Sequence, residues 1–271
     1  MSWLLPDWQK TVVFIGQETG DKKNFIGTGV LLNVSNIFCL STAKHVVYDK
    51  DNKRFRENLF VSFNSKDGKI LDRKIEDIKR TFNVEWISHN NEEVDIAIIP
   101  FGLDIEKDDV KTIPENLFIR FNEINVADEI FFLGFQPGLS LTRVKPIVRA
   151  GIISRLEDDK TFYIDTSAFP GNSGSPVFLK PSPISFRKEG INIGTTHMGK
   201  LIGIIGEYVP YQEYAVSSQT GRPRIMFEEN TGISRVWSID CINDILSSDK
   251  LTEQLRKLKG GGAVNDRHKS Q

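Results

Sequence analysis

Short apolar runs separated by turn residues fill most of the chain before residue 240. The runs are rich in β-branched and aromatic residues and are bounded by Gly, Asp or Asn, a pattern typical of strands joined by turns. We expect strands at residues 11–15, 29–34, 37–41, 59–63, 82–87, 94–99, 129–133, 146–154, 161–165, 174–179 and 201–207, with weaker candidates at 214–217 and 233–237. Because no helical pattern intervenes, the sequence predicts an all-β barrel or sandwich rather than βαβ units.

The end of the chain follows a different pattern. Six apolar residues recur there at helical spacing: Ile242, Ile245, Leu246, Leu251, Leu255 and Leu258. This spacing predicts one amphipathic C-terminal α-helix over residues 239–258, with Ser238 or Asp240 as its cap. The polar residues 259–271, which include three consecutive glycines, predict a disordered tail.

A chain of 271 residues is long enough for one sizeable β domain. A polar and charged stretch at residues 103–116 separates two sets of predicted strands. We therefore expect an N-terminal β half at 1–110 and a C-terminal β half at 111–238. These halves would form a single domain with a cleft between them.

Composition narrows the classes of function. With 35 Lys and Arg against 36 Asp and Glu, the chain has no net charge that would call for nucleic acid or an anionic membrane as a partner. No segment approaches the ~20 apolar residues of a membrane span, and the first residues lack a secretory signal pattern, so we expect a cytoplasmic protein. Cys39 and Cys241 are too few for a disulfide framework, and no cluster has the spacing of metal ligands, so neither metal nor cofactor is expected.

Residues 169–176, Phe-Pro-Gly-Asn-Ser-Gly-Ser-Pro, lie between two predicted strands. Glycine tolerates positive φ and lets backbone N–H groups point at a bound group. Such a turn can present the Ser173 hydroxyl together with the amides of Gly171 and Ser173, which would supply a nucleophile and an oxyanion hole. Gly, Ser and Pro also make ordinary loops, so this motif alone does not decide between the two interpretations.

A base and an orienting acid have candidates elsewhere in the chain. Of the four histidines, His45 directly follows a predicted strand, whereas His89 and His197 lie in polar stretches and His268 lies in the tail. Asp95 opens an otherwise apolar strand, where a buried carboxylate needs a partner such as an imidazole N–H. Each residue also has a plain structural interpretation: a buried histidine that is hydrogen-bonded, or a turn aspartate.

The order His45, Asp95, Ser173, each in its local context, resembles the trypsin-like (chymotrypsin-fold) serine peptidases. In that family two six-stranded antiparallel β-barrels pack together with the triad in the cleft between them. Four stretches are similar to the HtrA-type bacterial branch of the family: residues 132–138, 150–154, 164–174 and 201–205. Members of that branch usually carry a PDZ domain, which this chain does not show.

The resemblance implies a serine endopeptidase that acts on a protein or peptide substrate. It assigns His45 as general base, Asp95 as the acid that orients it, and Ser173 as the nucleophile that forms an acyl-enzyme. It also assigns the amides of Gly171 and Ser173 to the oxyanion hole.

The substrate pocket that the resemblance implies contains Ser167, Phe169, Gly206 and Glu207. Secreted digestive members carry an aspartate where Ser167 stands, and that aspartate binds basic side chains. Its replacement by serine favours a small or apolar residue before the scissile bond. The carboxylate of Glu207 is able to overturn this preference.

Two departures from the family pattern leave alternatives open. Lys44 precedes His45 where the family favours a small residue, and a neighbouring positive charge would lower the basicity of the imidazole unless the lysine points outward. Ser175 replaces a more common glycine. The same fold could therefore be a catalytically inactive module that binds a peptide or protein. It could also be an enzyme that stays latent until a regulatory protein partner reorders the serine loop.

Overall fold

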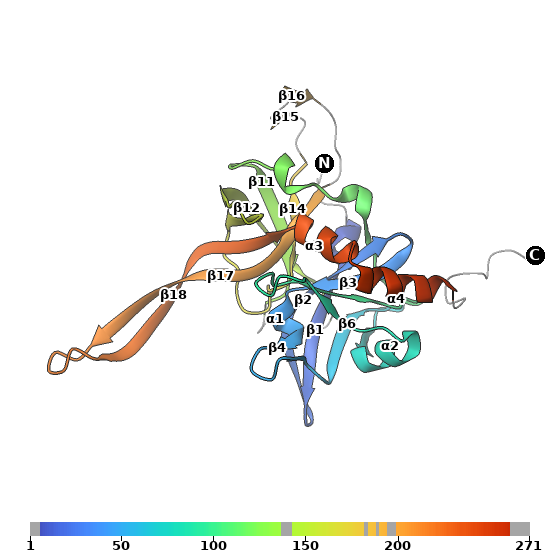
Figure 1. Ribbon diagram of the computed structural model, residues 1–271, viewed down its shortest axis with the longest axis horizontal. Helices are drawn as coiled ribbons and strands as arrows, with labels where there is room; N and C mark the ends of the chain where they lie inside the picture. Colours follow the sequence, from blue (N-terminus) through green and yellow to red (C-terminus); the bar gives the residue numbers. More distant parts are fainter. Residues whose placement is uncertain (1–5, 137–142, 182–183, 188–189, 194–198, 261–271) are drawn as a thin grey trace, which may run out of the picture.

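The computed structural model describes residues 6–136, 143–181, 184–187, 190–193 and 199–260. His197, His268, most of the expected tail and the end of the 132–138 stretch lie outside the described residues. The described chain forms two β-rich halves with helices at its C-terminal end (Figure 1). The all-β fold class is therefore confirmed.

The N-terminal half is an eight-stranded sheet rather than the six-stranded barrel that the resemblance suggested. Its main path runs in the order β7-β6-β1-β2-β3-β9-β8, and the short β10 adds to β2 in parallel. The bounds are β1 (Val12–Thr19), β2 (Lys22–Val34), β3 (Ile37–Thr42), β6 (Leu59–Asn64), β7 (Ile70–Lys74), β8 (Ile87–Ser88), β9 (Ala97–Pro100) and β10 (Ile113–Pro114). A small β4 (Tyr48–Asp49) and β5 (Arg54–Phe55) pair beside it.

The C-terminal half is a closed six-stranded barrel, as expected. Its strands neighbour one another in the order β11 (Glu129–Gly134), β12 (Ile147–Leu156), β13 (Thr161–Asp165), β18 (Pro223–Ser238), β17 (Lys200–Val216) and β14 (Pro176–Leu179). Residues that alternate along these strands fill the interior, for example Ile130 and Phe132 on β11. A separate hairpin joins β15 (Ile184–Arg187) and β16 (Gly190–Ile193).

Two expectations were wrong: a single C-terminal helix, and a strand over residues 82–87. The C-terminal segment forms two helices, α3 (Ile239–Leu246) and α4 (Asp249–Gly260), because Ser248 bonds back to the Ile245 carbonyl at 2.7 Å and begins a new helix. The helical spacing of apolar residues continues on both sides of Ser248, so this spacing alone could not show the break between the two helices. Residues 82–86 are not a strand: α2 (Ile75–Phe82) ends there, at an Asn83 with φ of 51°, and of the expected strand only Ile87 belongs to one, β8.

The last two barrel strands continue far beyond the barrel. β17 and β18 stay paired from Gly203↔Ser238 to Val216↔Pro223, and their outer halves form a ribbon that extends away from the body (Figure 1). Of this projecting part the sequence predicted only the fragment 214–217, whereas the other weak candidate, 233–237, is the part of β18 that pairs with β13 in the barrel. The residues of the ribbon do not alternate cleanly between apolar and polar, because neither face lies on a core.

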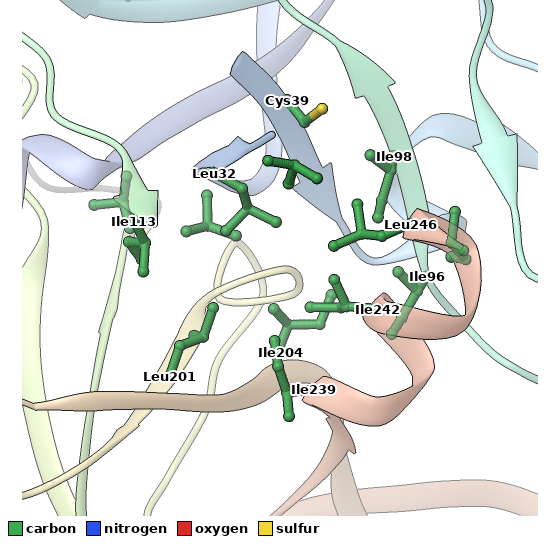
Figure 2. Close-up of a cluster of buried hydrophobic side chains, with 14 of the residues drawn as sticks. Leu32, Cys39, Ile96, Ile98, Ile113, Leu201, Ile204, Ile239, Ile242 and Leu246 are labelled. Atoms are coloured by element: carbon green, nitrogen blue, oxygen red, sulfur yellow. The ribbon is translucent and has the colours of Figure 1, made fainter. Parts of the chain in front are cut away.

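An apolar cluster joins the two halves and α3 (Figure 2). It draws on strands of both halves and on the helix: Leu32, Cys39, Ile96, Ile98, Ile113, Leu201, Ile204, Ile239, Ile242 and Leu246. Each fully buried Ile or Leu contributes about 1.5–3 kcal/mol by leaving water. The cluster therefore fixes how the halves sit together, and with that the position of the residues between them.

Candidate active site

The His45 imidazole and the Asp95 carboxylate are paired. His45 lies in α1 (Lys44–Val47), directly after β3, and its Nδ1 is 2.6 Å from Asp95 Oδ2. The other carboxylate oxygen accepts the His45 backbone N–H at 2.8 Å, and the Asp95 carbonyl accepts the Lys44 N–H at 3.1 Å. Because an ionised carboxylate only accepts, Nδ1 carries the proton and Nε2 is left as the basic nitrogen.

The Lys44 ammonium contacts groups other than the imidazole. It lies 5.1 Å from the centre of the Tyr48 ring and 3.4 Å from the Glu92 carbonyl oxygen, to which it donates. This is the outward arrangement that the sequence left open. It separates the lysine charge from His45 by directing it toward an aromatic face and a carbonyl.

Two consecutive tight turns share Asn172, and Ser173 is the second residue of the second turn. Asn172 N–H bonds to the Phe169 carbonyl at 2.9 Å, and Ser175 N–H bonds to the Asn172 carbonyl at 2.9 Å. The third residue of each turn is a glycine with positive φ, 95° at Gly171 and 86° at Gly174, as type II turns require. These turns place a half-buried Ser173 in the segment after β13.

Buried polar side chains hold these turns in place. Asn172 is fully buried; its side chain accepts the Phe169 N–H at 2.9 Å and donates to the Phe135 carbonyl at 2.6 Å. From β2, the Thr28 hydroxyl donates to the Gly171 carbonyl at 2.7 Å, and the Thr28 N–H donates to the Ser173 carbonyl at 2.9 Å. The N-terminal sheet thus fixes the peptide planes on both sides of Asn172 and Ser173.

Two backbone amides remain available beside the serine. Within the described residues, neither the Gly171 N–H nor the Ser173 N–H has a hydrogen-bond partner. Thr28 bonds to the carbonyls of these two residues and leaves their amides open. The Ser173 hydroxyl likewise forms no hydrogen bond with any residue in the described ranges. Unpaired donors next to a free hydroxyl are what an acyl-transfer site offers to a substrate carbonyl.

His45 and Ser173 line one cleft of about 280 Å³. Of the other expected site residues, Gly171, Phe169 and Glu207 line it as well, whereas Asp95 stands behind the imidazole. Ile205, which ends the 201–205 stretch that resembles the cleft-lining strand of the HtrA-type branch, also lines the cleft. The other lining residues were not among the site residues expected from the sequence: Ile26, Ala168, Pro170 and Tyr208. Their closeness in sequence to the expected site is the signal that could have indicated three of them; Ile26 comes from β2.

Ser167 and Gly206 are not among the residues that line the cleft. A Cβ added at Gly206 would come within 2.8 Å of the Trp237 indole, so this glycine permits close packing against β18. The Ser167 hydroxyl instead lies near Gly232.

Tyr208, at the edge of the cleft, is tied to the projecting ribbon. Its hydroxyl donates to the Glu228 carboxylate, which also accepts the Gln212 side chain at 3.0 Å. This hydrogen bond raises the pKa of Tyr208 and lowers the pKa of Glu228, because each keeps the proton on the phenol. The ring is thereby held over the cleft in its neutral form.

The described part of the chain contains neither a helix long and apolar enough to cross a membrane nor a group of three or more His, Cys, Asp or Glu side chains able to hold a metal. Cys39 and Cys241 are both buried and unpaired.

Comparison with known proteins gives results of two kinds. No curated protein matches the chain. A serine endoprotease from Yersinia pestis has a similar structure, with a TM-score of 0.52 and 17% identity over 92% of this chain; the chain spans 64% of that protein's length. A thermostable serine protease, AL20, from an extremophilic microorganism matches with a TM-score of 0.52 and 11% identity over 96% of this chain and 100% of its own. At these identities the likeness concerns the fold.

A family model for the trypsin-like peptidase domain matches residues 27–181, which is more than half of the chain and includes His45, Asp95 and Ser173. The resemblance drawn from the residues and the family match agree, and the chain belongs to the trypsin-like peptidase family.

Proposed function

We propose that the protein is a serine endopeptidase that cleaves peptide bonds through an acyl-enzyme on Ser173. The observation that carries this proposal is the joint opening of the Asp95-paired His45 and of Ser173 onto one cleft, beside two unpaired amides. The two structurally similar proteins, which are named as serine proteases, add support at the level of fold.

In the proposed reaction, His45 Nε2 takes the proton of the Ser173 hydroxyl as its oxygen attacks the scissile carbonyl. Asp95 holds the tautomer and stabilises the imidazolium that forms. The Gly171 and Ser173 amides stabilise the oxyanion, each contributing about 2.7–4 kcal/mol. The imidazolium then protonates the leaving amine. In the second half of the reaction, water gives a proton to His45 and attacks the acyl-enzyme carbonyl, which releases the acid product and restores the Ser173 hydroxyl.

The cleft favours a small or apolar substrate side chain. Ile26, Ala168 and Ile205 contribute apolar surface, and the nearest carboxylate, Glu207, is 67% exposed. The Arg235 guanidinium lies 3.9 Å from Glu207, which partly offsets its charge. A basic substrate side chain would therefore gain little from Glu207, because an exposed ion pair contributes at most about 1 kcal/mol.

Labelling with a fluorescent fluorophosphonate tests the nucleophile. We expect the folded protein to be labelled, and Ser173→Ala and His45→Ala to lose labelling. Ser218→Ala, at an exposed serine, and His89→Ala, at an imidazole 3.5 Å from Asp244, serve as matched controls that keep it. Labelling that persists in Ser173→Ala would contradict the proposal.

A latent enzyme is the second candidate, favoured by the absence of a hydrogen bond on the Ser173 hydroxyl among the described residues. Labelling that begins only after addition of a peptide or protein activator would support latency. The inactive binding module loses its main argument, because the Lys44 charge is directed away from His45. Absence of labelling under every condition, with peptide binding retained, would favour that module.

A further inference from the structure

The ribbon formed by the outer parts of β17 and β18 exposes large apolar side chains. Here "the arm" means residues 209–230. Six of its apolar residues are half exposed or more: Tyr211, Tyr214, Val216, Ile225, Met226 and Phe227. A two-stranded hairpin is at best marginally stable alone in water, and exposed apolar patches of this kind mark interaction sites.

One face of the arm combines apolar and unpaired acidic side chains. Cross-strand pairing places Tyr211 opposite Glu229, Glu213 opposite Phe227, and Ala215 opposite Ile225. Since these pairs alternate along the strands with Gln212↔Glu228 and Tyr214↔Met226, the six residues share one face, which we call the Phe227 face. On the opposite face, Glu228 is already bonded to Tyr208 and Gln212.

Charge is distributed unevenly along the arm. Glu213 and Glu229 lie toward the body on the Phe227 face, with the apolar pair Ala215 and Ile225 next along the arm. Arg222 lies at the tip opposite Ser217, whose N–H donates to the Arg222 carbonyl at 2.9 Å, so it shares this face, whereas Arg224 is adjacent to Ile225 and belongs to the other face. Among the residues that the structure describes, none forms an ion pair with Glu213, Glu229 or Arg222. A two-fold axis near the apolar pair would place the basic tip of one arm over the acidic part of another, so the arm is self-complementary.

The area sets the strength to expect. Tyr211, Ile225 and Phe227 are 54–57% exposed, which is about 100 Å² each for side chains of this size, or about 300 Å² of apolar surface per copy. With the flanking charged groups, two copies would bury less than the ~1,200 Å² at which standard interfaces begin. Interfaces of this size are typical of weak, transient complexes, so we expect a reversible dimer, with a dissociation constant on the order of micromolar, rather than a permanent one.

We propose that the Phe227 face of the arm binds the Phe227 face of a second copy of this chain, antiparallel and about a two-fold axis. We infer a second copy as the occupant because, in an antiparallel pair, the acidic part of each arm faces the basic tip of the other and the apolar residues face each other. A peptide added to the open edge of β17 would leave this apolar face uncovered. The inference is independent of the proposed peptidase activity.

Sedimentation over a concentration series up to about 100 μM tests the dimer, since this range exceeds a micromolar dissociation constant. We expect wild type to change from monomer to dimer. Ile225→Ser with Phe227→Ser should raise the dissociation constant at least tenfold. Tyr214→Ser with Met226→Ser, at equally exposed positions of the opposite face, should leave it unchanged. All of these side chains are exposed, so an unchanged thermal midpoint is expected and serves as the folding control.

Charge reversal tests the antiparallel arrangement. Arg222→Glu makes an acidic Phe227 face, and Glu213→Arg with Glu229→Arg makes a basic one. Each variant alone should be monomeric, and an equal mixture of the two should dimerise. Dimers of either single variant at wild-type strength, or a mixture that stays monomeric, would overturn the arrangement.

Cross-linking provides a second readout. Both native cysteines are buried, so a cysteine introduced by Ala215→Cys would be the accessible thiol. Because Ala215 lies near the proposed axis, a short bis-maleimide should join two chains, whereas Tyr214→Cys on the opposite face should not be cross-linked. Wild type that remains monomeric throughout the concentration series would refute the proposal. This holds even if the arm variants impair cleavage of long peptides, since the arm would then bind substrate rather than a second copy.

Discussion

Thr28 connects the N-terminal sheet to the serine turns, and its hydroxyl is the contact to remove. The hydroxyl donates to the Gly171 carbonyl at 2.7 Å and accepts the Phe135 N–H at 3.3 Å, and the residue is fully buried. Thr28→Val keeps the shape of the side chain but leaves both backbone groups without this partner. The carbonyl it releases belongs to the peptide between Gly171 and Asn172.

Each buried group left unpaired costs about 1–3 kcal/mol, so we expect the free energy of unfolding to fall by an amount in this range or somewhat above it. The turn that carries the Gly171 amide would also lose its fixed orientation. Complete loss of one oxyanion donor lowers kcat by about 10²–10³, which sets the upper limit, and we expect a decrease of at least tenfold. KM should change less, because the substrate side chain contacts other parts of the cleft.

The assays are urea unfolding and the rate of fluorophosphonate labelling or peptide cleavage. Thr11→Val is the matched control: Thr11 is 5% exposed, and its hydroxyl donates to the Trp8 carbonyl at 2.8 Å, outside the cleft. It should lose comparable stability and keep its rate. If Thr28→Val kept the wild-type rate while losing stability as Thr11→Val does, Thr28 would have no role in positioning the serine turn.

Three further outcomes are expected. Asp95→Asn should lower kcat by about 10⁴ in a peptide-cleavage assay, since an amide cannot stabilise the imidazolium; a decrease below tenfold would contradict the assigned role. Gly134→Ala places a Cβ 2.2 Å from Ser175 Oγ and should lower both the thermal midpoint and the labelling rate, and adding Ser175→Gly should restore part of each. Burial raises the pKa of Cys39 to about 12 and also raises the pKa of Cys241, so both stay protonated at neutral pH; the folded protein should resist iodoacetamide, and mass spectrometry should show two adducts only after unfolding.

The local chemistry of the candidate site was readable from the sequence. The turn around Ser173 follows from Pro170, Gly171 and Gly174, because glycine adopts without steric cost the positive φ that consecutive type II turns need. The apolar run after Asp95 indicated that its carboxylate requires a partner. The order of the three residues then indicated the family, which the match over residues 27–181 confirms.

Other features depended on contacts between distant segments. Thr28 looks like an ordinary strand residue, and only the packing of β2 against the serine turns, 143 residues away, gives its hydroxyl a role. Lys44 was ambiguous until the position of the Tyr48 ring and the Glu92 carbonyl decided its direction. Ile26 joins the cleft for the same reason.

The helix break and the arm show the limit of periodicity. The apolar spacing of α3 and α4 continues across Ser248, so only its hydrogen bond to Ile245 reveals two helices. In the arm, the two strands are held by hydrogen bonds to each other and neither face packs on a core. Alternation of apolar and polar residues reports burial, so it cannot detect these strands. The sequence by itself determined the backbone turns and the residue types that carry the chemistry, because these depend on local sterics. Tertiary structure decided which groups meet and which faces stay open, because those depend on contacts distant in sequence.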